Sequence, residues 1–162
     1  MALHTLHRPD VAGLWPSVLD RLAARRIGGR DWNIWRGLVG LAYLATAVFN
    51  AIYTLPRSSE LDGYAEGAWF GFLAEFMRDV FMPNGAAFMA AVIVFEILVG
   101  TLILTRGVAV DIGIVLSVLW VLLVLPFLAW PFPVANIVLL VLQGSVLLRR
   151  YDRFVWFGLR RG

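Results

Sequence analysis

The chain has 162 residues, of which 60% are hydrophobic and 15% are charged, and it contains no cysteine. Its mean hydropathy of +0.79 is a value that a water-soluble domain of this size rarely reaches. The composition therefore predicts an integral membrane protein with one core of packed helices. Without cysteine, the chain by itself has no disulfide, no iron–sulfur cluster and no thiolate metal site.

Residues 1–35 are predicted to form a cytoplasmic arm. Pro16 suits the first position of a helix, and the residues after it place apolar side chains beside arginines at helical spacing. A basic amphipathic helix of this kind typically rests on anionic lipid head groups. His4 and His7, both in this arm, are the only histidines in the chain, so no membrane helix offers an imidazole to a haem or a buried metal. No metal site is predicted.

Four apolar segments follow within residues 36–150, and each as a helix approaches the hydrocarbon thickness of roughly 30 Å. They cover residues 37–55, 86–104, 108–130 and 133–149. The predicted fold class is an all-α integral membrane protein, a four-transmembrane-helix bundle. Pro126 either kinks the third helix near its outer end or ends it there.

The placement of arginine predicts the orientation of the chain. Six arginines precede the first segment, five lie at or after the last residue of the fourth, and one lies between the second and third, whereas only Arg57 and Arg78 lie in residues 56–85. By the positive-inside rule, both termini are cytoplasmic, residues 56–85 form an outer loop, and residues 151–162 form a basic cytoplasmic tail. A cleaved signal peptide competes for the first segment, because Ala45-Thr46-Ala47 resembles a cleavage site, but the long preceding arm favours a retained helix.

The predicted outer loop contains a second amphipathic segment. Its aromatic residues recur at helical spacing, opposite charged side chains. They include Trp69, Phe70, Phe72 and Phe76. We expect a helix at the outer leaflet that acts as a lid over the bundle, or as an aromatic wall or docking face for a ligand or partner.

Glu96 is the only carboxylate near the middle of an apolar segment, where a charge costs at least about 2.5 to 3.5 kcal/mol. Each of the other segments places one polar residue within roughly 3 Å of the same depth, and two more lie one turn away. The predicted buried polar or ligand site comprises Glu96, Thr46, Tyr43, Asn50, Ser117 and Gln143. Three interpretations are open: the layer holds the helices together, Glu96 carries a proton or binds a quinone-like head group, or Glu96 meets a partner subunit.

Two stretches of the apolar segments carry a family pattern. Arg36 to Leu44 has an Arg and Gly followed by an aromatic residue, and Phe95 to Leu104 has a Glu, three residues, a Gly and an apolar run. Over about residues 36–150 the chain thereby resembles the DoxX family of small four-helix bacterial membrane proteins. The resemblance implies that the family positions are Arg36, Gly40, Tyr43, Glu96 and Gly100. Many relatives have a small residue and then Lys near the outer end of the first helix, where this chain has Ala47 and Asn50.

The resemblance also implies a function. Some members of the family are named as subunits of thiosulfate:quinone or terminal quinol oxidation systems. The leading expectation is therefore a non-catalytic or quinone-proximal accessory subunit that anchors a membrane redox complex in the bacterial inner membrane. Such a subunit has no activity alone, or takes part in a quinone-linked oxidoreductase.

The expected ligands and partners follow from these points. No cofactor is expected to be held covalently or by His or Cys, while a quinone or a lipid fits the apolar surroundings. The expected partners are membrane lipids and other membrane subunits or a second copy of the chain, and not nucleic acid, because the insertion rule already accounts for the arginines. The alternatives are a small proton-coupled transporter acting as an oligomer through Glu96, and a purely structural membrane subunit.

Overall fold

The computed structural model describes residues 27–61 and 63–159, and in these residues it is all-helical apart from an isolated bridge between Ile27 and Arg150. This confirms the all-α prediction for the described residues. The predicted amphipathic helix of the N-terminal arm, with His4 and His7, lies outside them, as do the last three residues of the predicted tail.

The first long helix, α2, covers Arg30–Phe49 and begins before the predicted start at residue 37. The Asn33 side chain donates hydrogen bonds to the carbonyl oxygens of Gly28 and Gly29, at 3.2 and 3.0 Å, which holds the chain at the start of the helix. Beyond Phe49 the chain continues as a π-helical turn over Asn50–Thr54 and a 3₁₀ helix over Leu55–Glu60.

Most of the predicted outer loop, residues 56–85, is helical. Two short helices, α3 (Gly63–Glu66) and α4 (Gly71–Phe76), are followed by a π-helical turn over Met77–Phe81 and a 3₁₀ turn over Met82–Asn84. These lead without a break into α5, Gly85–Leu104. Pro83 lies in the first turn of the 3₁₀ segment, where a proline is tolerated, so it does not end the helical path.

The second half of the chain forms α6 (Val108–Val124), α7 (Phe132–Val146) and a short α8 (Val155–Leu159). A 3₁₀ turn over Leu125–Phe127 follows α6, and Leu128 is then extended, so the helix ends at Pro126. Of the two interpretations of Pro126, termination is the one observed.

Three helical stretches of the described chain are long and apolar enough to cross a membrane: Arg30–Glu60, Gly71–Leu104 and Val108–Phe127. The fourth predicted span corresponds to α7, which is a shorter apolar helix of 15 residues. At 1.5 Å per residue it extends about 22 Å, less than the hydrocarbon thickness of roughly 30 Å.

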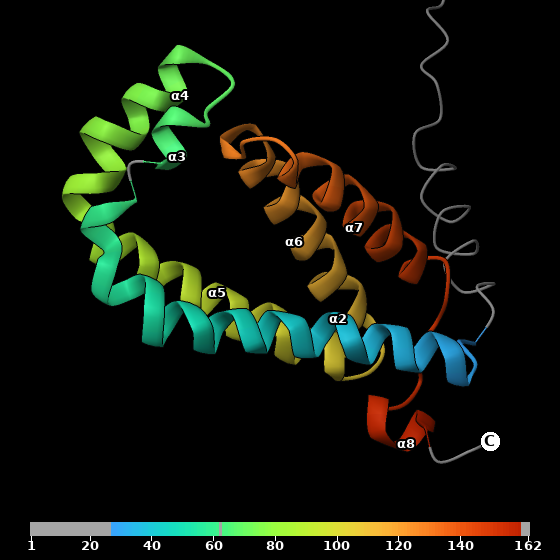
Figure 1. The fold of residues 1–162 in the computed structure, drawn as a ribbon. Helices are drawn as coiled ribbons and strands as arrows, with labels where there is room; N and C mark the ends of the chain where they lie inside the picture. The colour runs from blue at the N-terminus through green and yellow to red at the C-terminus, as the bar shows by residue number, and fades with distance from the viewer. Residues whose placement is uncertain (1–26, 62, 160–162) are drawn as a thin grey trace, which may run out of the picture.

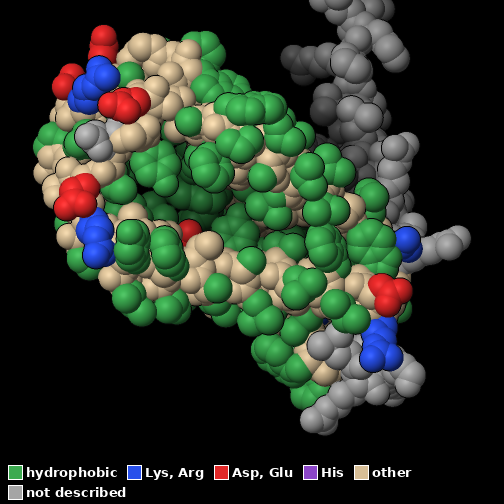
Figure 2. Space-filling view, viewed as in Figure 1, with side chains coloured by type: hydrophobic (Ala, Val, Ile, Leu, Met, Phe, Trp, Pro, Cys, Tyr) green, Lys and Arg blue, Asp and Glu red, His purple; other side chains and the backbone are tan. Residues whose placement is uncertain are grey.

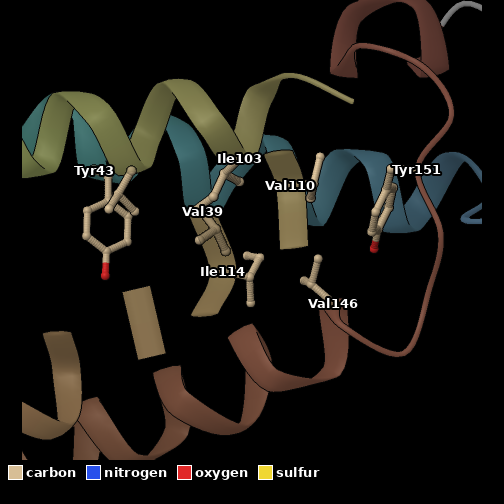
Figure 3. Packing of buried hydrophobic residues seen from close by; sticks show 8 residues of the cluster. Val39, Tyr43, Ile103, Val110, Ile114, Val146 and Tyr151 are labelled. Carbon is tan, nitrogen blue, oxygen red and sulfur yellow. The ribbon is translucent and has the colours of Figure 1, made fainter. Parts of the chain in front are cut away.

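The long helices form two pairs that are close at one end and apart at the other (Figure 1). α2 and α5 lie side by side along their length, and α6 runs next to α7. The buried hydrophobic core joins the pairs only at the end where α2 begins and α7 ends (Figure 3). It contains Val39, Tyr43, Val99, Ile103, Val110, Ile114, Val146 and Tyr151.

Two glycines allow α2 and α5 to approach closely. A Cβ atom added to Gly100 would lie 2.9 Å from the backbone oxygen of Gly40, and one added to Gly40 would lie 2.8 Å from Leu104 Cγ. Small residues at such a crossing let two helix backbones come together, which is the usual way that helices pack in lipid. The position of Glu96 on α5 relative to α2 therefore depends on this contact.

Candidate functional site

A hollow lies between the two helix pairs, beyond the end at which the core joins them. Figure 2 shows it lined mainly by hydrophobic side chains, with an acidic side chain visible inside. α5 carries one acidic residue, Glu96, which is 6% exposed. The middle of α5 therefore holds a buried carboxylate next to mainly apolar side chains.

Glu96 is bound through both of its carboxylate oxygens. The Nδ2 atom of Asn50 lies 2.9 Å from Oε2 and 3.1 Å from Oε1. The Asn50 Oδ1 atom in turn accepts a hydrogen bond from the Thr54 hydroxyl, at 2.8 Å, and this contact orients the amide so that its NH₂ group points at the carboxylate. Because the amide is neutral, its N–H can donate to either the ionised or the protonated form of the Glu96 carboxyl group.

Asn50 lies where the winding of the helix changes. α2 ends at Phe49, and Asn50 begins the π-helical turn, while its own backbone N–H still bonds to the oxygens of Thr46 and Ala47 as in a regular helix. π-turns within helices are rare and occur frequently at functional sites. The contact between Asn50 and Glu96 is the polar link between this helix pair.

Tyr43 connects the first helix pair to the second. Its hydroxyl donates a hydrogen bond to the backbone oxygen of Ser117 in α6, at 3.3 Å. In Figure 3 the hydroxyl points away from α2 and α5. The Thr46 hydroxyl lies within hydrogen-bond distance of carbonyl oxygens in its own helix, those of Ala42 and Tyr43, and it also lies close to the Glu96 carboxyl.

Two buried polar side chains next to this layer have no protein partner in the described residues. Gln143 in α7 is 0% exposed, and neither its Nε2 nor its Oε1 atom has a hydrogen bond. The same is true of the Ser117 hydroxyl, which is also fully buried. Leaving such a group unpaired costs about 1 to 3 kcal/mol, so buried polar groups normally have a partner, whether protein, water or ligand.

The six residues of the predicted polar site therefore divide into three groups. Asn50 and Glu96 bind each other, and Tyr43 binds the backbone of Ser117. Gln143 and the Ser117 hydroxyl are buried with unused hydrogen-bonding capacity. Thr46 bonds to its own helix.

The segment after α3 lies against the turn between α6 and α7, at the end of the molecule away from the hydrophobic core. The backbone N–H of Trp69 donates to the oxygen of Pro126 at 2.9 Å, and the indole N–H donates to the oxygen of Leu128 at 3.1 Å. Gly67 packs there too, since an added Cβ would lie 3.2 Å from the Phe127 oxygen. Of the predicted lid or docking residues, Trp69 thus tethers the segment to the turn between α6 and α7.

The other three aromatic residues of that prediction lie around α4. Phe70, Phe72 and Phe76 are exposed, and the rings of Phe70 and Phe72 stack with centroids 5.8 Å apart. Phe76 meets Phe88 of α5 edge to face, at 6.4 Å. They form an aromatic surface next to the tether, while the closing contact itself is made by Trp69.

Arg36 was singled out only by the family resemblance, and Asn33 was not predicted to have a role. Arg36 is 0% exposed and donates hydrogen bonds to the oxygens of Thr105 and Arg153 and to Asn33 Oδ1, at 2.9 to 3.0 Å. It thereby joins the start of α2 to the residue that follows α5 and to the segment between α7 and α8. The available signal was the spacing of three residues between Asn33 and Arg36, which places both on one helix face.

Within residues 27–61 and 63–159, no group of three His, Asp or Glu side chains is placed to hold a metal ion. No family model, curated protein or solved structure matches the chain. The resemblance to the DoxX family therefore stays a prediction, and the site is interpreted from its own geometry.

Proposed function

We propose that the chain is a multi-pass membrane protein that binds a lipid-soluble molecule with a hydrogen-bonding head group, of the quinone class, in the hollow beside Glu96. In this role it is a quinone-proximal accessory subunit of a larger membrane redox complex. The observation that carries the proposal is the combination of a buried carboxylate, two unpaired buried polar side chains and an apolar hollow.

The proposed membrane arrangement has four crossings. α7 completes its crossing with the residues up to Arg149, whose long side chain can reach the interface while its stem lies in the apolar region. Both termini then lie on the cytoplasmic side, as the distribution of arginine predicts. The proposed location is the inner membrane of a bacterium, which rests on the DoxX resemblance.

The polar residues of the site match the chemistry of such a head group. A quinone presents two carbonyl oxygens on a flat apolar ring. The Gln143 amide N–H and the Ser117 hydroxyl are buried donors without a hydrogen bond, so in this proposal the head group enters between the helices past the wall of the hollow to reach them. Glu96 in its protonated form is a third donor. The apolar walls of the hollow take the ring and tail, as in most small-molecule sites, where a few polar groups fix the orientation of the ligand.

The accessory role follows from the residues that the chain lacks. After His7 the sequence contains no histidine, and it contains no cysteine at all. Haem and iron–sulfur clusters are held mainly by these residues, so a partner subunit would carry the electrons to and from the bound molecule. The chain would position the head group and exclude water around it.

Binding can be tested by titrating a short-tailed ubiquinone analogue into the purified protein and following the quenching of tryptophan fluorescence. Trp120 is a suitable reporter because its ring lies 5.0 Å from that of Phe95, the neighbour of Glu96. We expect saturable quenching. In Gln143→Leu the dissociation constant should rise about tenfold, which corresponds to one lost hydrogen bond of about 1.4 kcal/mol.

The matched control is Asn136→Leu, which also replaces an amide in α7. The Asn136 side chain bonds to the Phe132 oxygen of its own helix, so its loss should leave quinone affinity unchanged. Equal affinity in wild type and Gln143→Leu would refute quinone binding at this layer. Proton-coupled uptake by vesicles that contain the protein, lost in Glu96→Gln, would instead favour the transporter alternative. If Glu96→Gln has no effect in either assay, the structural role is favoured.

Association with a redox complex is a separate test. The protein is extracted from its native membrane in a mild detergent, and every protein that leaves with it is identified by mass spectrometry. Stoichiometric redox subunits would support the accessory role, while a small oligomer of the chain alone would contradict it.

A further inference from the structure

A second candidate site lies where α2 begins, at the other end of this helix from residues 56–85. A cavity of about 390 Å³ opens between the start of α2 and the chain that follows α7. Its lining includes Gly28, Gly29, Arg30, Asn33, Tyr151 and Arg153. Its volume falls within the range of roughly 300 to 1,000 Å³ that is usual for small-molecule sites.

A buried cation without a carboxylate lies directly behind this cavity. The Arg36 guanidinium donates to the side chain of Asn33 and to the backbone oxygen of Arg153, two residues that line the cavity. Its other contacts are the Thr105 oxygen and the ring of Tyr151, whose centroid is 4.5 Å away. All of these partners are neutral, and its Nε atom has no hydrogen bond. Buried charges are normally paired with an opposite charge, and none of the contacts of Arg36 named here is an anion.

The cavity wall adds further positive charge. Within the described residues, the side chains of Arg30 and Arg153 form no salt bridge. A salt bridge is formed there by Arg150 and Asp152, whose Nε and Oδ1 atoms are 3.2 Å apart. Asp152 also lines the cavity, but its charge is offset by Arg150. Asp31 lies in the first turn of α2. The backbone N–H groups at the start of this 20-residue helix add partial positive charge at the same place.

We propose that this cavity, here called the arginine pocket, binds a phosphate ester, with Arg30 and Arg153 contacting its oxygens and Arg36 supplying charge from behind. Arginine is suited to this role because its planar guanidinium binds phosphate through two parallel hydrogen bonds. The pocket lies at an end of the membrane helices, which is the level of lipid head groups, and basic pockets between membrane helices are known to take anionic head groups. The phosphate can come from an anionic lipid or from a soluble ester.

The two sources are distinguished in one experiment on the full-length protein in nanodiscs or detergent. Native mass spectrometry measures the binding of phosphatidylglycerol, with phosphatidylcholine as the neutral lipid for comparison. A parallel arm titrates glycerol 3-phosphate and follows protein stability. We expect the double variant Arg30→Gln/Arg153→Gln to bind the preferred phosphate ligand about 30-fold more weakly, from about 5-fold for each arginine.

Two control variants keep the test specific. Arg30→Lys/Arg153→Lys preserves the charge and should retain most of the binding. Arg57→Gln makes the same charge change beyond the far end of α2, about 40 Å away by helical rise and well outside the Debye length of about 8 Å, so it should not alter binding.

Preferential binding of phosphatidylglycerol, lost in the Gln double variant and kept in both controls, would support the proposal with a lipid as the source. Stabilisation by glycerol 3-phosphate with the same pattern of variants would support it with a soluble ester as the source. Binding in neither arm, or an equal loss in Arg57→Gln, would overturn it. Binding of quinone at the Glu96 layer is measured separately, and neither result depends on the other.

Discussion

Asn50 stabilises Glu96 because the donor nitrogen of its amide lies within hydrogen-bond distance of both oxygens of the carboxylate. A carboxyl group in a span would otherwise lose its hydration without compensation, which is costly in an apolar medium. The Thr54 hydroxyl fixes the amide in the required direction. Three side chains from α2's continuation and α5 thus form a chain of hydrogen bonds whose members depend on one another.

We expect Asn50→Leu to lower the free energy of unfolding by about 1.5 kcal/mol, near the upper end for bonds between membrane helices. The loss arises because the Glu96 carboxyl stays buried after its donor is removed. Unfolding in mixed detergent micelles measures the effect. In the double variant Asn50→Leu/Glu96→Leu the cost should be smaller than the sum of the two single changes. Additive costs would show that the two side chains do not interact, and Asn136→Leu serves as the control for replacing an amide in a span.

Helical depth alone identified the polar layer but not the direction of each side chain. Thr46 lies at nearly the depth of Glu96 in the sequence, and its hydroxyl lies close both to the carboxyl and to carbonyl oxygens of α2. Asn50, predicted one turn further out, makes the two shortest contacts with the carboxylate oxygens. Depth follows from counting residues, whereas rotation about the helix axis depends on the winding and the packing of neighbours.

At the scale of the helices, the crossing of α2 and α5 depends on the absence of side chains at Gly40 and Gly100. Each glycine lies against the backbone or a branched side chain of the opposite helix. Elsewhere the chain tolerates more, since Gly144 in α7 has no atom within 4 Å of an added Cβ. Replacement by alanine should therefore affect stability differently at the two kinds of glycine.

Gly100→Ala is expected to destabilise the protein by about 1 to 3 kcal/mol, because its methyl group would lie 2.9 Å from the backbone oxygen of Gly40 and would push the helices apart. Gly144→Ala should be neutral or stabilising by up to about 1 kcal/mol, since alanine favours a helix over glycine. Thermal unfolding in detergent compares the two variants. Equal effects of the two substitutions would argue against a close crossing at Gly100.

The segment before α5 shows that a helix can extend beyond its apolar stretch. The sequence predicted an amphipathic helix within residues 56–85, with Arg78 and Asp79 among its charged side chains, and a separate span from residue 86; in the structure the helical path runs through Arg78, Asp79 and Pro83 into α5. Charged side chains are compatible with a helix that projects beyond the apolar region, and a proline in a first turn removes no hydrogen bond. The boundary of an apolar stretch is therefore not the boundary of a helix.

At the scale of the molecule, the two helix pairs are joined by hydrophobic packing at one end and by hydrogen bonds at the other. The hydrophobic core joins the helix pairs next to the start of α2, and Trp69 tethers the outer segment to the turn after α6. Between these two points the pairs separate and leave the hollow beside Glu96 (Figure 2). For the proposed function, this arrangement would give a ligand a lateral approach while the helix pairs stay connected at both ends.

The predicted orientation can be tested because the chain contains no cysteine of its own. Single cysteines are introduced at Ser59, in the outer segment, and at Val108, at the start of α6; both positions are exposed. In intact cells or spheroplasts, a membrane-impermeant maleimide should label Ser59→Cys, and should label Val108→Cys only after lysis. Labelling of both in intact cells, or the reverse order, would contradict the orientation predicted from arginine.

The sequence by itself determined the all-helical class, the apolar stretches and the set of polar residues near one depth, because these depend on composition and on the rise of a helix. Only the tertiary structure decided that Asn50 binds Glu96, that Gln143 and the Ser117 hydroxyl have no protein partner, and that Arg36 joins Thr105 to Arg153. These contacts lie between residues far apart in the chain. They depend on how each helix is rotated and where it crosses its neighbours, which the packing of the glycines and of the hydrophobic core sets.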